Sequence, residues 1–405
     1  MTAAVATSPT VSLEKQGTVG VIVIDNPPVN ATSHSVRAGL VAAVAALTAE
    51  TDLTAAVIIG KGTGFIAGAD IKEFNKPPEA PDLSAVIAAI EACPKPVVAA
   101  IHGAALGGGF EVALACDARI AAADASVGLP EVSLGIIPGA GGTQRLPRLT
   151  GIAMAIDLIA SARRVSARDA LGLGMIDAVA ERDLLDAAVA LALRSGKRLV
   201  AHLPVPAEPE ADIEAVVATH MKKARGRASI AAAIAAVRSA GRVPVREALA
   251  ADHAAFHALR TGEEAQALRH LFFAERAARK LDTEAEPQAV ATVGIVGGGT
   301  MGAGIAAAFA ASGFGVILHD SSAEARERAA ASVRTALADL GKPAVDVSSP
   351  DYPPGAERER QIDNSCLNMP TEGNGVIGVT SVGPSERKAY YSDYGVEQAD
   401  VSAPG

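Results

Sequence analysis

The chain has 405 residues, of which 49% are apolar and 20% charged, and its formal net charge is −9. This length allows two or three domains with sizeable cores. The acidic balance, without a cluster of Lys and Arg, argues against a nucleic acid or an anionic membrane as a partner. The three cysteines fit no metal-ligand spacing and suit a reducing compartment, and no export signal or membrane span is predicted. We therefore expect a cytoplasmic chain without a bound metal.

Strands and a helix alternate in the first hundred residues. Residues 35–50 place Val36, Leu40, Val44 and Leu47 at helical spacing. Short apolar runs bounded by Gly, Pro and Asn predict strands. This alternation indicates an α/β core. The predicted strands are 17–25, 55–60 and 96–103.

The middle of the chain has a different composition. Residues 182–195 and 210–280 are rich in Ala, Arg and Glu and are expected to be mostly helical. Between them, the proline-containing stretch 202–212 (HLPVPAEPEAD) indicates a linker. A new apolar strand begins at residue 291 and opens a second α/β segment.

Three consecutive glycines precede a glutamate in ALGGGFEVALACD (105–117). Small residues let the backbone pass close to a ligand, and a helix is predicted to begin near Gly108 or Gly109. The first N–H groups of that helix have no intrahelical acceptor and can donate outward. Glu111 lies on the same face, three residues after Gly108. A backbone donor and a carboxylate therefore point to one place, as oxyanion stabilisation requires.

Two further features support this interpretation. A second glycine-rich turn, FIAGADIKEF (65–74), can supply another N–H, from Ala69. A second carboxylate, Glu131, lies between Pro130 and an apolar run. Two glutamates in apolar surroundings can divide the roles of base and acid. The alternative is a helix-terminal charge at Glu111 and a surface residue at Glu131, which the two glycine-rich turns make less attractive.

Four segments stand in order along the N-terminal half: NPPVNA, FIAGADIKEF, KPVVAAIHGAALGGGFEVALACDARIA and LPEVSLGIIPGAGGTQRLPRL. Together they closely resemble the enoyl-CoA hydratase/isomerase (crotonase) family, from about residue 12 to 190. The resemblance implies a spiral of repeated ββα units. It makes Ala69 and Gly108 the oxyanion-hole donors and Glu111 and Glu131 the catalytic pair. The substrate-binding residues that it implies are Ala67, Gly68, Asp70, Ile71 and Gly139, although Asp70 could instead cap a helix.

The reaction that the resemblance implies is hydration of a trans-2-enoyl-CoA to a 3-hydroxyacyl-CoA in fatty-acid β-oxidation, without a cofactor. The glutamates hold the water, one accepting its proton and the other supplying a proton to C2. Having both glutamates favours a hydratase over a Δ3–Δ2-enoyl-CoA isomerase. The remaining alternative is a non-catalytic CoA- or NAD-binding remnant.

A second glycine pattern follows a strand in VGIVGGGTMGAGIAAAFAASGFGVILHD. Gly297, Gly299 and Gly302 form G-x-G-x-x-G, and Asp320 ends the next strand, as in sites for the pyrophosphate and ribose of NAD. The stretch resembles the start of a 3-hydroxyacyl-CoA dehydrogenase domain, in which Met301 matches a position close to the cofactor. Residues 256–280 resemble the helical connector of bifunctional hydratase/dehydrogenases.

The dehydrogenase pattern then stops. That family needs a catalytic histidine well after the fingerprint, and the sequence has none after His319. Only two strands of the Rossmann-type βαβ fragment are expected, so we predict a truncated NAD-binding segment without dehydrogenase activity. From about residue 344 the sequence resembles an internal piece of a subtilisin-like protease that lacks the catalytic triad, which indicates a chimera with a poorly ordered tail. The expected divisions are 1–190 (hydratase), 191–288 (connector), 289–341 (NAD-binding fragment) and 342–405 (tail).

Overall fold

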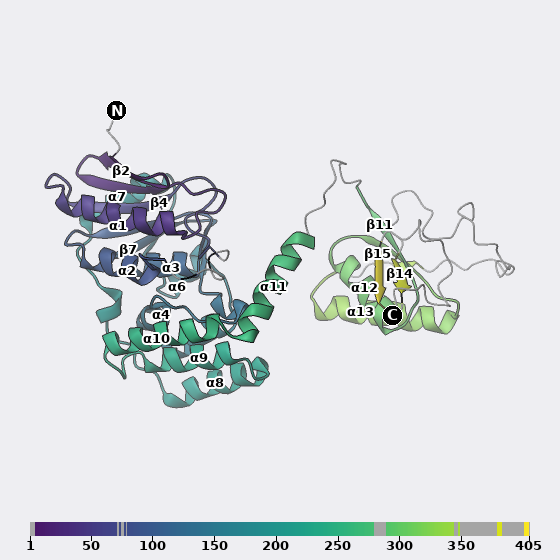
Figure 1. Ribbon diagram of the computed structural model, residues 1–405. Helices are drawn as coiled ribbons and strands as arrows, with labels where there is room; N and C mark the ends of the chain where they lie inside the picture. Colours follow the sequence, from purple (N-terminus) through teal and green to yellow (C-terminus); the bar gives the residue numbers. More distant parts are fainter. Residues whose placement is uncertain are drawn as a thin grey trace. The chain divides into compact units, whose positions relative to one another are not determined.

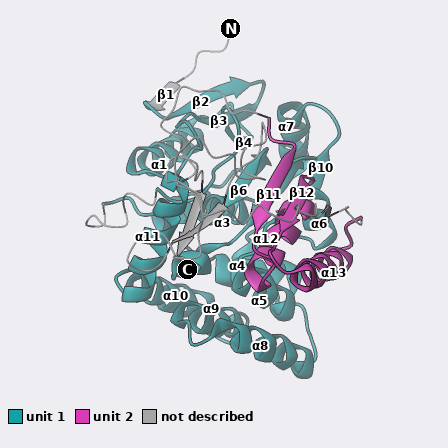
Figure 2. Ribbon diagram, turned by 90° about the vertical axis from the view of Figure 1, so that its right-hand side faces the viewer, with its two compact units in different colours: residues 1–281 teal, residues 282–405 magenta. Residues whose placement is uncertain are grey.

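The computed structural model describes residues 5–70, 73, 77, 79–278, 289–343, 347–348, 379–382 and 401–404. The chain divides into two compact units, residues 1–281 and 282–405, which are shown in Figures 1 and 2. The expected poor order of the tail falls almost wholly on residues outside this described part.

A seven-stranded sheet forms the centre of the first unit. Its strands run in the order β1-β2-β3-β4-β5-β7-β10. The β1/β2 and β2/β3 pairs are antiparallel, and every later neighbour is parallel. The three strands predicted from the sequence are confirmed as β3, β4 and β5. The bounds are β1 (Val5–Ser8), β2 (Val11–Gln16), β3 (Val19–Ile24), β4 (Ala55–Gly60), β5 (Val97–Ile101), β7 (Ala118–Ala122) and β10 (Ala178–Ala180).

Both faces of the parallel strands β4, β5 and β7 are buried, as expected for a parallel sheet. In β4, Ala55 and Val57 join a small core that also contains residues of α7 (Leu184–Arg194). The alternate residues Ala56 and Ile58 face the main core of the unit, together with α1 (His34–Ala49) and α2 (Leu83–Ala92). The period of two along the strand thus assigns neighbouring side chains to opposite cores.

A smaller sheet lies beside the large one and carries the glycine-rich turn. Its order is β6-β8-β9, and its β6/β8 pair is parallel. The chain leaves β6 through Gly107 and enters α3 directly. The elements of this region are β6 (Ala104–Leu106), α3 (Gly108–Ala115), β8 (Ser126–Gly128), the 3-10 helix η2 (Glu131–Leu134), α4 (Gly142–Thr150), α5 (Ile152–Ala160), β9 (Val165–Ser166) and α6 (Ala167–Gly172).

Four helices complete the first unit and confirm the helical prediction for residues 210–280. Figure 1 shows α8, α9 and α10 stacked beside α4. α8 and α9 pack on α5, whereas α9 and α10 pack on α4. The expected linker 202–212 is shorter than predicted, because the 3-10 helix η3 ends at its first residue and α8 begins within it. The bounds are η3 (Val200–His202), α8 (Glu210–Ala224), α9 (Ala228–Ser239), α10 (Val245–Arg260) and α11 (Glu263–Ala278).

The second unit is built around a parallel sheet with the order β11-β12-β13. The expectation of only two strands is wrong, because Val347 and Ser348 pair with Val316 and Ile317 of β12 and so add a short third strand. A core of its own joins β11, β12, α12 and α13. The bounds are β11 (Thr292–Val296), α12 (Thr300–Ala311), β12 (Gly315–His319), α13 (Ala323–Asp339), β13 (Val347–Ser348), β14 (Val379–Val382) and β15 (Val401–Pro404).

Candidate active site

Backbone conformation and close packing require glycine in the turn that leads into α3. Gly107, the N-cap of α3, has φ +53°, a region that L side chains avoid. A Cβ on Gly109 would lie 2.2 Å from the carbonyl oxygen of Ile66. The two glycine-rich turns predicted from the sequence therefore pack directly on one another. The helix begins at Gly108, as the sequence predicted.

Glu111 is 3% exposed and lies in the first turn of α3. Its Oε1 accepts hydrogen bonds from Ala140 N at 2.9 Å and Gly142 N at 2.8 Å, both at the glycine-rich entry to α4. Burial raises the pKa of Glu111 above its ordinary value, whereas these two N–H groups and the charge of Arg145 oppose that shift. The carboxyl group is therefore held by fixed donors that favour its charged form.

Glu131 opens η2 and has very different surroundings. The residue is partly exposed, but its Oε2 is buried and has no hydrogen-bond partner among the described residues. Burial, and then the nearby charge of Glu111, raise the pKa of Glu131 well above its ordinary value. A Cβ on Gly107 would lie 3.0 Å from Glu131 Oε1, so this carboxyl group lies directly over the N-terminus of α3. The structure thus brings the two predicted glutamates together.

The two predicted oxyanion donors also adjoin. A Cβ on Gly108 would lie 4.0 Å from Ala69 N, so the two residues lie next to each other. Gly108 is the first residue of α3, and its N–H has no acceptor within the helix. Thr32 N donates to Gly68 O at 2.9 Å and fixes the peptide group that Ala69 N–H belongs to.

The remaining predicted substrate-binding residues differ in how exposed they are. Ala67 is exposed, and Gly68 is buried. Asp70 is partly exposed, whereas Ile71 lies outside the described residues. A Cβ on Gly139 would lie 2.6 Å from the ring of Phe256 in α10, so packing alone excludes a side chain there.

Sequence reasoning missed a polar layer behind Glu111. Gln144 Nε2 donates to Asp252 Oδ2 at 2.9 Å, and Thr143 Oγ1 donates to the same oxygen. Arg145 Nη1 donates to Ala140 O at 3.0 Å, on the residue whose N–H binds Glu111. All four side chains of this layer are at most 3% exposed. The available signal was the run TQR directly after a glycine-rich turn. Three consecutive polar residues beside a predicted site can form a buried hydrogen-bonded layer, because buried polar groups nearly always have partners.

A second missed contact holds the turn that carries Glu131. Arg227, before α9, donates from Nη2 to Val132 O, next to Glu131. Its Nε donates to Glu264 Oε1 at 3.2 Å, and the same carboxylate accepts from Ser229 Oγ at 2.8 Å. The helices after residue 210 therefore support both glutamates, which their expected role as a connector did not suggest.

The predicted NAD residues lie together within the second unit. The turn with Gly297 and Gly299 connects β11 to α12, and Met301 is 70% exposed. Asp320 Oδ2 accepts from Gly298 N at 2.7 Å, and its Oδ1 accepts from Ser322 N at 3.0 Å. Gly302 lies in the first turn of α12. The acid at the end of β12 therefore faces the glycine turn, and its expected contact with the ribose of NAD stays a prediction.

Within the described part of the chain, no helix is long and apolar enough to cross a membrane. Among the same residues, no group of three or more His, Cys, Asp and Glu side chains is arranged to hold a metal ion.

Comparison with known proteins supplies the family. The pattern of the enoyl-CoA hydratase/isomerase family matches residues 14–204, and that of the 3-hydroxyacyl-CoA dehydrogenase NAD-binding domain matches residues 292–348. The second match ends seven residues beyond the expected division at 341 and includes the short third strand.

Two peroxisomal bifunctional enzymes resemble most of the chain. The identity is 43% over 317 residues for the one from Danio rerio and 39% over 320 residues for the one from Homo sapiens. Each alignment covers 75% of this chain but 44% of the relative, so the chain spans less than half the length of these proteins.

A shorter relative and a solved structure match the first part alone. A probable enoyl-CoA hydratase of Bacillus subtilis (strain 168) is 44% identical over 197 residues, which are 46% of this chain and 76% of the relative. The enoyl-CoA hydratase/isomerase of Pseudoalteromonas atlantica T6c shares the fold, with a TM-score of 0.51, 23% identity and coverage of 66% of this chain and 97% of its own. The chain belongs to the enoyl-CoA hydratase/isomerase family and also carries a segment of the dehydrogenase NAD-binding domain.

Proposed function

We propose that the first unit hydrates trans-2-enoyl-CoA thioesters to 3-hydroxyacyl-CoA in fatty-acid β-oxidation. The observation that carries this proposal is the meeting of Glu111 and Glu131 beside the paired amides of Ala69 and Gly108. Two carboxyl groups that influence each other's charge but have different surroundings can be held in opposite protonation states. An acid, a base and an oxyanion site then lie close to one another.

The geometry divides the roles of the two glutamates. Glu111, held by two N–H donors, is the ionised base that takes a proton from water as the water oxygen bonds to C3. Glu131, with its strongly raised pKa, begins protonated and delivers its proton to C2. Negative charge that develops on the thioester oxygen between these events is stabilised by Ala69 N–H and Gly108 N–H. Water is thereby added across the double bond, with Glu111 left protonated and Glu131 ionised. Return of one proton from Glu111 to Glu131 restores the starting state.

A direct assay tests the proposal. Purified full-length chain is mixed with crotonyl-CoA, and loss of the conjugated enoyl-thioester absorbance is followed, with 3-hydroxybutyryl-CoA as the expected product. Turnover of a 3-enoyl-CoA instead would indicate the isomerase alternative. A rise in melting temperature with crotonyl-CoA but without turnover would indicate the non-catalytic remnant.

Several finer assignments belong to the same proposal. Residues 67–71 and Gly139 are assigned to CoA and substrate binding, and NAD binding is assigned to the turn of Gly297 and to Asp320. We also propose that these 405 residues do not by themselves catalyse dehydrogenation, because no histidine stands between His319 and residue 405. Formation of NADH from a 3-hydroxyacyl-CoA would contradict this expectation.

We further infer the divisions 1–190, 191–288, 289–341 and 342–405, the last being protease-like sequence joined to a truncated bifunctional enzyme. Sequencing genomic DNA through the codons around residue 344 tests the fusion. We propose that the protein is located in the cytoplasm, although several relatives are named peroxisomal enzymes. A fluorescent fusion of the full chain distinguishes the two compartments.

A further inference from the structure

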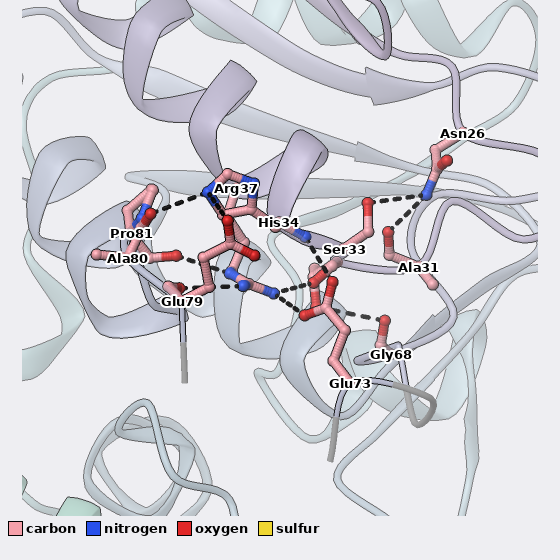
Figure 3. Close-up of polar contacts among 11 residues, drawn as sticks. Asn26, Ala31, Ser33, His34, Arg37, Gly68, Glu73, Glu79, Ala80 and Pro81 are labelled. Atoms are coloured by element: carbon pink, nitrogen blue, oxygen red, sulfur yellow. Dashed lines mark hydrogen bonds and ion pairs between the residues drawn. The ribbon is translucent and has the colours of Figure 1, made fainter. Parts of the chain in front are cut away.

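The segment after the oxyanion loop is tied to the start of α1 by one buried arginine, Arg37, which is 9% exposed. Its Nη1 donates to Glu73 Oε2 at 2.7 Å and to Thr32 O at 2.8 Å. Its Nε donates to Pro81 O at 2.7 Å, and its Nη2 donates to Glu79 O at 3.3 Å. Figure 3 shows Arg37 with its contacts to the labelled residues Glu73, Glu79 and Pro81.

Glu73 receives two donors at once. Besides Arg37, it accepts from His34 N at 2.8 Å through Oε1. Burial raises the pKa of Glu73, but the hydrogen bonds from Arg37 and His34 N and the charge of Arg37 outweigh it, so the pKa lies below its ordinary value. The carboxylate is therefore charged at neutral pH, and the pair with Arg37 is a charge-assisted bond.

Thr32 connects this cluster to the proposed oxyanion hole. Its carbonyl oxygen is held by Arg37, and its N–H donates to Gly68 O at 2.9 Å. Gly68 O and Ala69 N–H belong to the same peptide group, which is planar and trans, so they point in opposite directions. Fixing the carbonyl oxygen of Gly68 on Thr32 therefore fixes the direction of Ala69 N–H.

We propose that Arg37 is a positioning residue of the oxyanion hole, which acts through Thr32 and Glu73 to orient the Ala69 amide toward the thioester oxygen. This inference rests on the proposed function of the first unit. It assigns a role to a side chain for which no contact with Glu111 or Glu131 is seen and which is not itself expected to touch the substrate. A purely structural arginine would stabilise the fold without affecting how strongly the bound carbonyl is polarised.

The test compares Arg37→Ala, Arg37→Lys and Glu73→Gln with the parent chain. A matched control is Arg238→Ala, which removes an ion-paired arginine that is 28% exposed and lies on α9. Loss of one oxyanion donor lowers kcat by about 100- to 1,000-fold, so a donor that is only misdirected is expected to lower kcat by about 10-fold or more, with KM changed little. Lysine restores a charge toward Glu73 but not the forked contacts, so Arg37→Lys should fall between the parent and Arg37→Ala.

A spectroscopic readout separates positioning from folding. The carbonyl stretch of bound crotonyl-CoA is measured by infrared difference spectroscopy in a Glu131→Gln background, where turnover is slow. Hydrogen bonds in the oxyanion hole lower this frequency, so adding Arg37→Ala should return it toward the solution value, and adding Arg238→Ala should not. If Arg37→Ala does not fold, Glu73→Gln decides, since it keeps the shape but removes the charge and one of the two accepting oxygens.

The outcomes separate the proposed hydratase function from the positioning role of Arg37. A parent chain that binds but does not hydrate crotonyl-CoA overturns the proposed function. An active parent whose kcat and carbonyl frequency survive Arg37→Ala and Glu73→Gln overturns the positioning role alone. A fall in kcat with an unchanged carbonyl frequency also overturns it.

Discussion

The surroundings of Glu111 and Glu131 differ in the one respect that matters for acid–base chemistry. Glu111 accepts from two backbone N–H groups and has Arg145 nearby, whereas the buried Oε2 of Glu131 has no hydrogen-bond partner among the described residues. Burial raises the pKa of both carboxyl groups, so burial alone cannot separate them. The difference comes from the backbone of another segment, the entry to α4, which donates to one carboxylate only.

This comparison shows how a fold can assign unequal roles to identical side chains. Fixed donors favour the charged form of Glu111, and the charge that results raises the pKa of Glu131 further. The inequality is therefore self-reinforcing. It can be broken at either glutamate, at the glycines that seat them, or in the polar layer behind α4.

The largest effect is expected from Glu131→Gln. Glutamine has nearly the same shape but cannot deliver a proton to C2, so kcat for crotonyl-CoA hydration should fall by about 100- to 10,000-fold. Circular dichroism should show an unchanged fold. Glu181→Gln, at an exposed position, is the control and should retain parental activity. Near-normal turnover of Glu131→Gln would contradict the acid role.

Gly107→Ala tests whether the seat of Glu131 matters. The new Cβ would lie 3.0 Å from Glu131 Oε1 and should displace the carboxyl group. Because a displacement of about 1 Å can cost roughly 100-fold in rate, kcat should fall by about 10-fold or more. Steady-state hydration of crotonyl-CoA measures this.

A matched variant separates the displacement from backbone strain. Gly17 has φ +63° and nothing within 4 Å of its added Cβ, so Gly17→Ala carries positive-φ strain without touching a side chain. It should lower stability and leave kcat unchanged. Equal losses of kcat in both variants would show that strain, and not contact with Glu131, accounts for the effect.

Local patterns such as apolar runs and glycine-rich turns were enough to predict the strands β3, β4 and β5 and the start of α3, and they marked Glu111 and Glu131 as a candidate pair. It did not reveal Asp252 behind Glu111, because that contact joins α10 to α4 across more than a hundred residues. Nor did it reveal Arg37, whose acceptors are mostly backbone carbonyls that no side-chain pattern marks. The third strand β13 was missed since two residues carry no periodicity.

The same variant, Glu131→Gln, is expected to be slightly more stable than the parent chain although it is far less active. A carboxyl group with a raised folded-state pKa stabilises the fold fully below its unfolded pKa, and this contribution is lost as pH rises through the folded value. At neutral pH the parent chain therefore carries a penalty that Glu131→Gln lacks. The variant should melt at a higher temperature near pH 7, with the difference vanishing below about pH 4. A thermal melt at each pH measures this, and a lower melting temperature at pH 7 would contradict it.

The smallest effect is expected from Asp252→Asn, which removes a charge behind Glu111. Asparagine can still accept from Thr143 and Gln144 through its carbonyl oxygen, so the contact between α10 and α4 should survive. The negative charge of Asp252 helps to raise the pKa of Glu111, so its loss lowers that pKa. Because Glu111 must be ionised to act as base, the acidic limb of kcat/KM should move to lower pH, while the plateau changes by less than about 10-fold. Asp124→Asn, at an exposed site, should leave the profile in place. A shift to higher pH in Asp252→Asn would mean that Asp252 does not act on Glu111 through its charge, and the base would then have to be sought elsewhere in the pair.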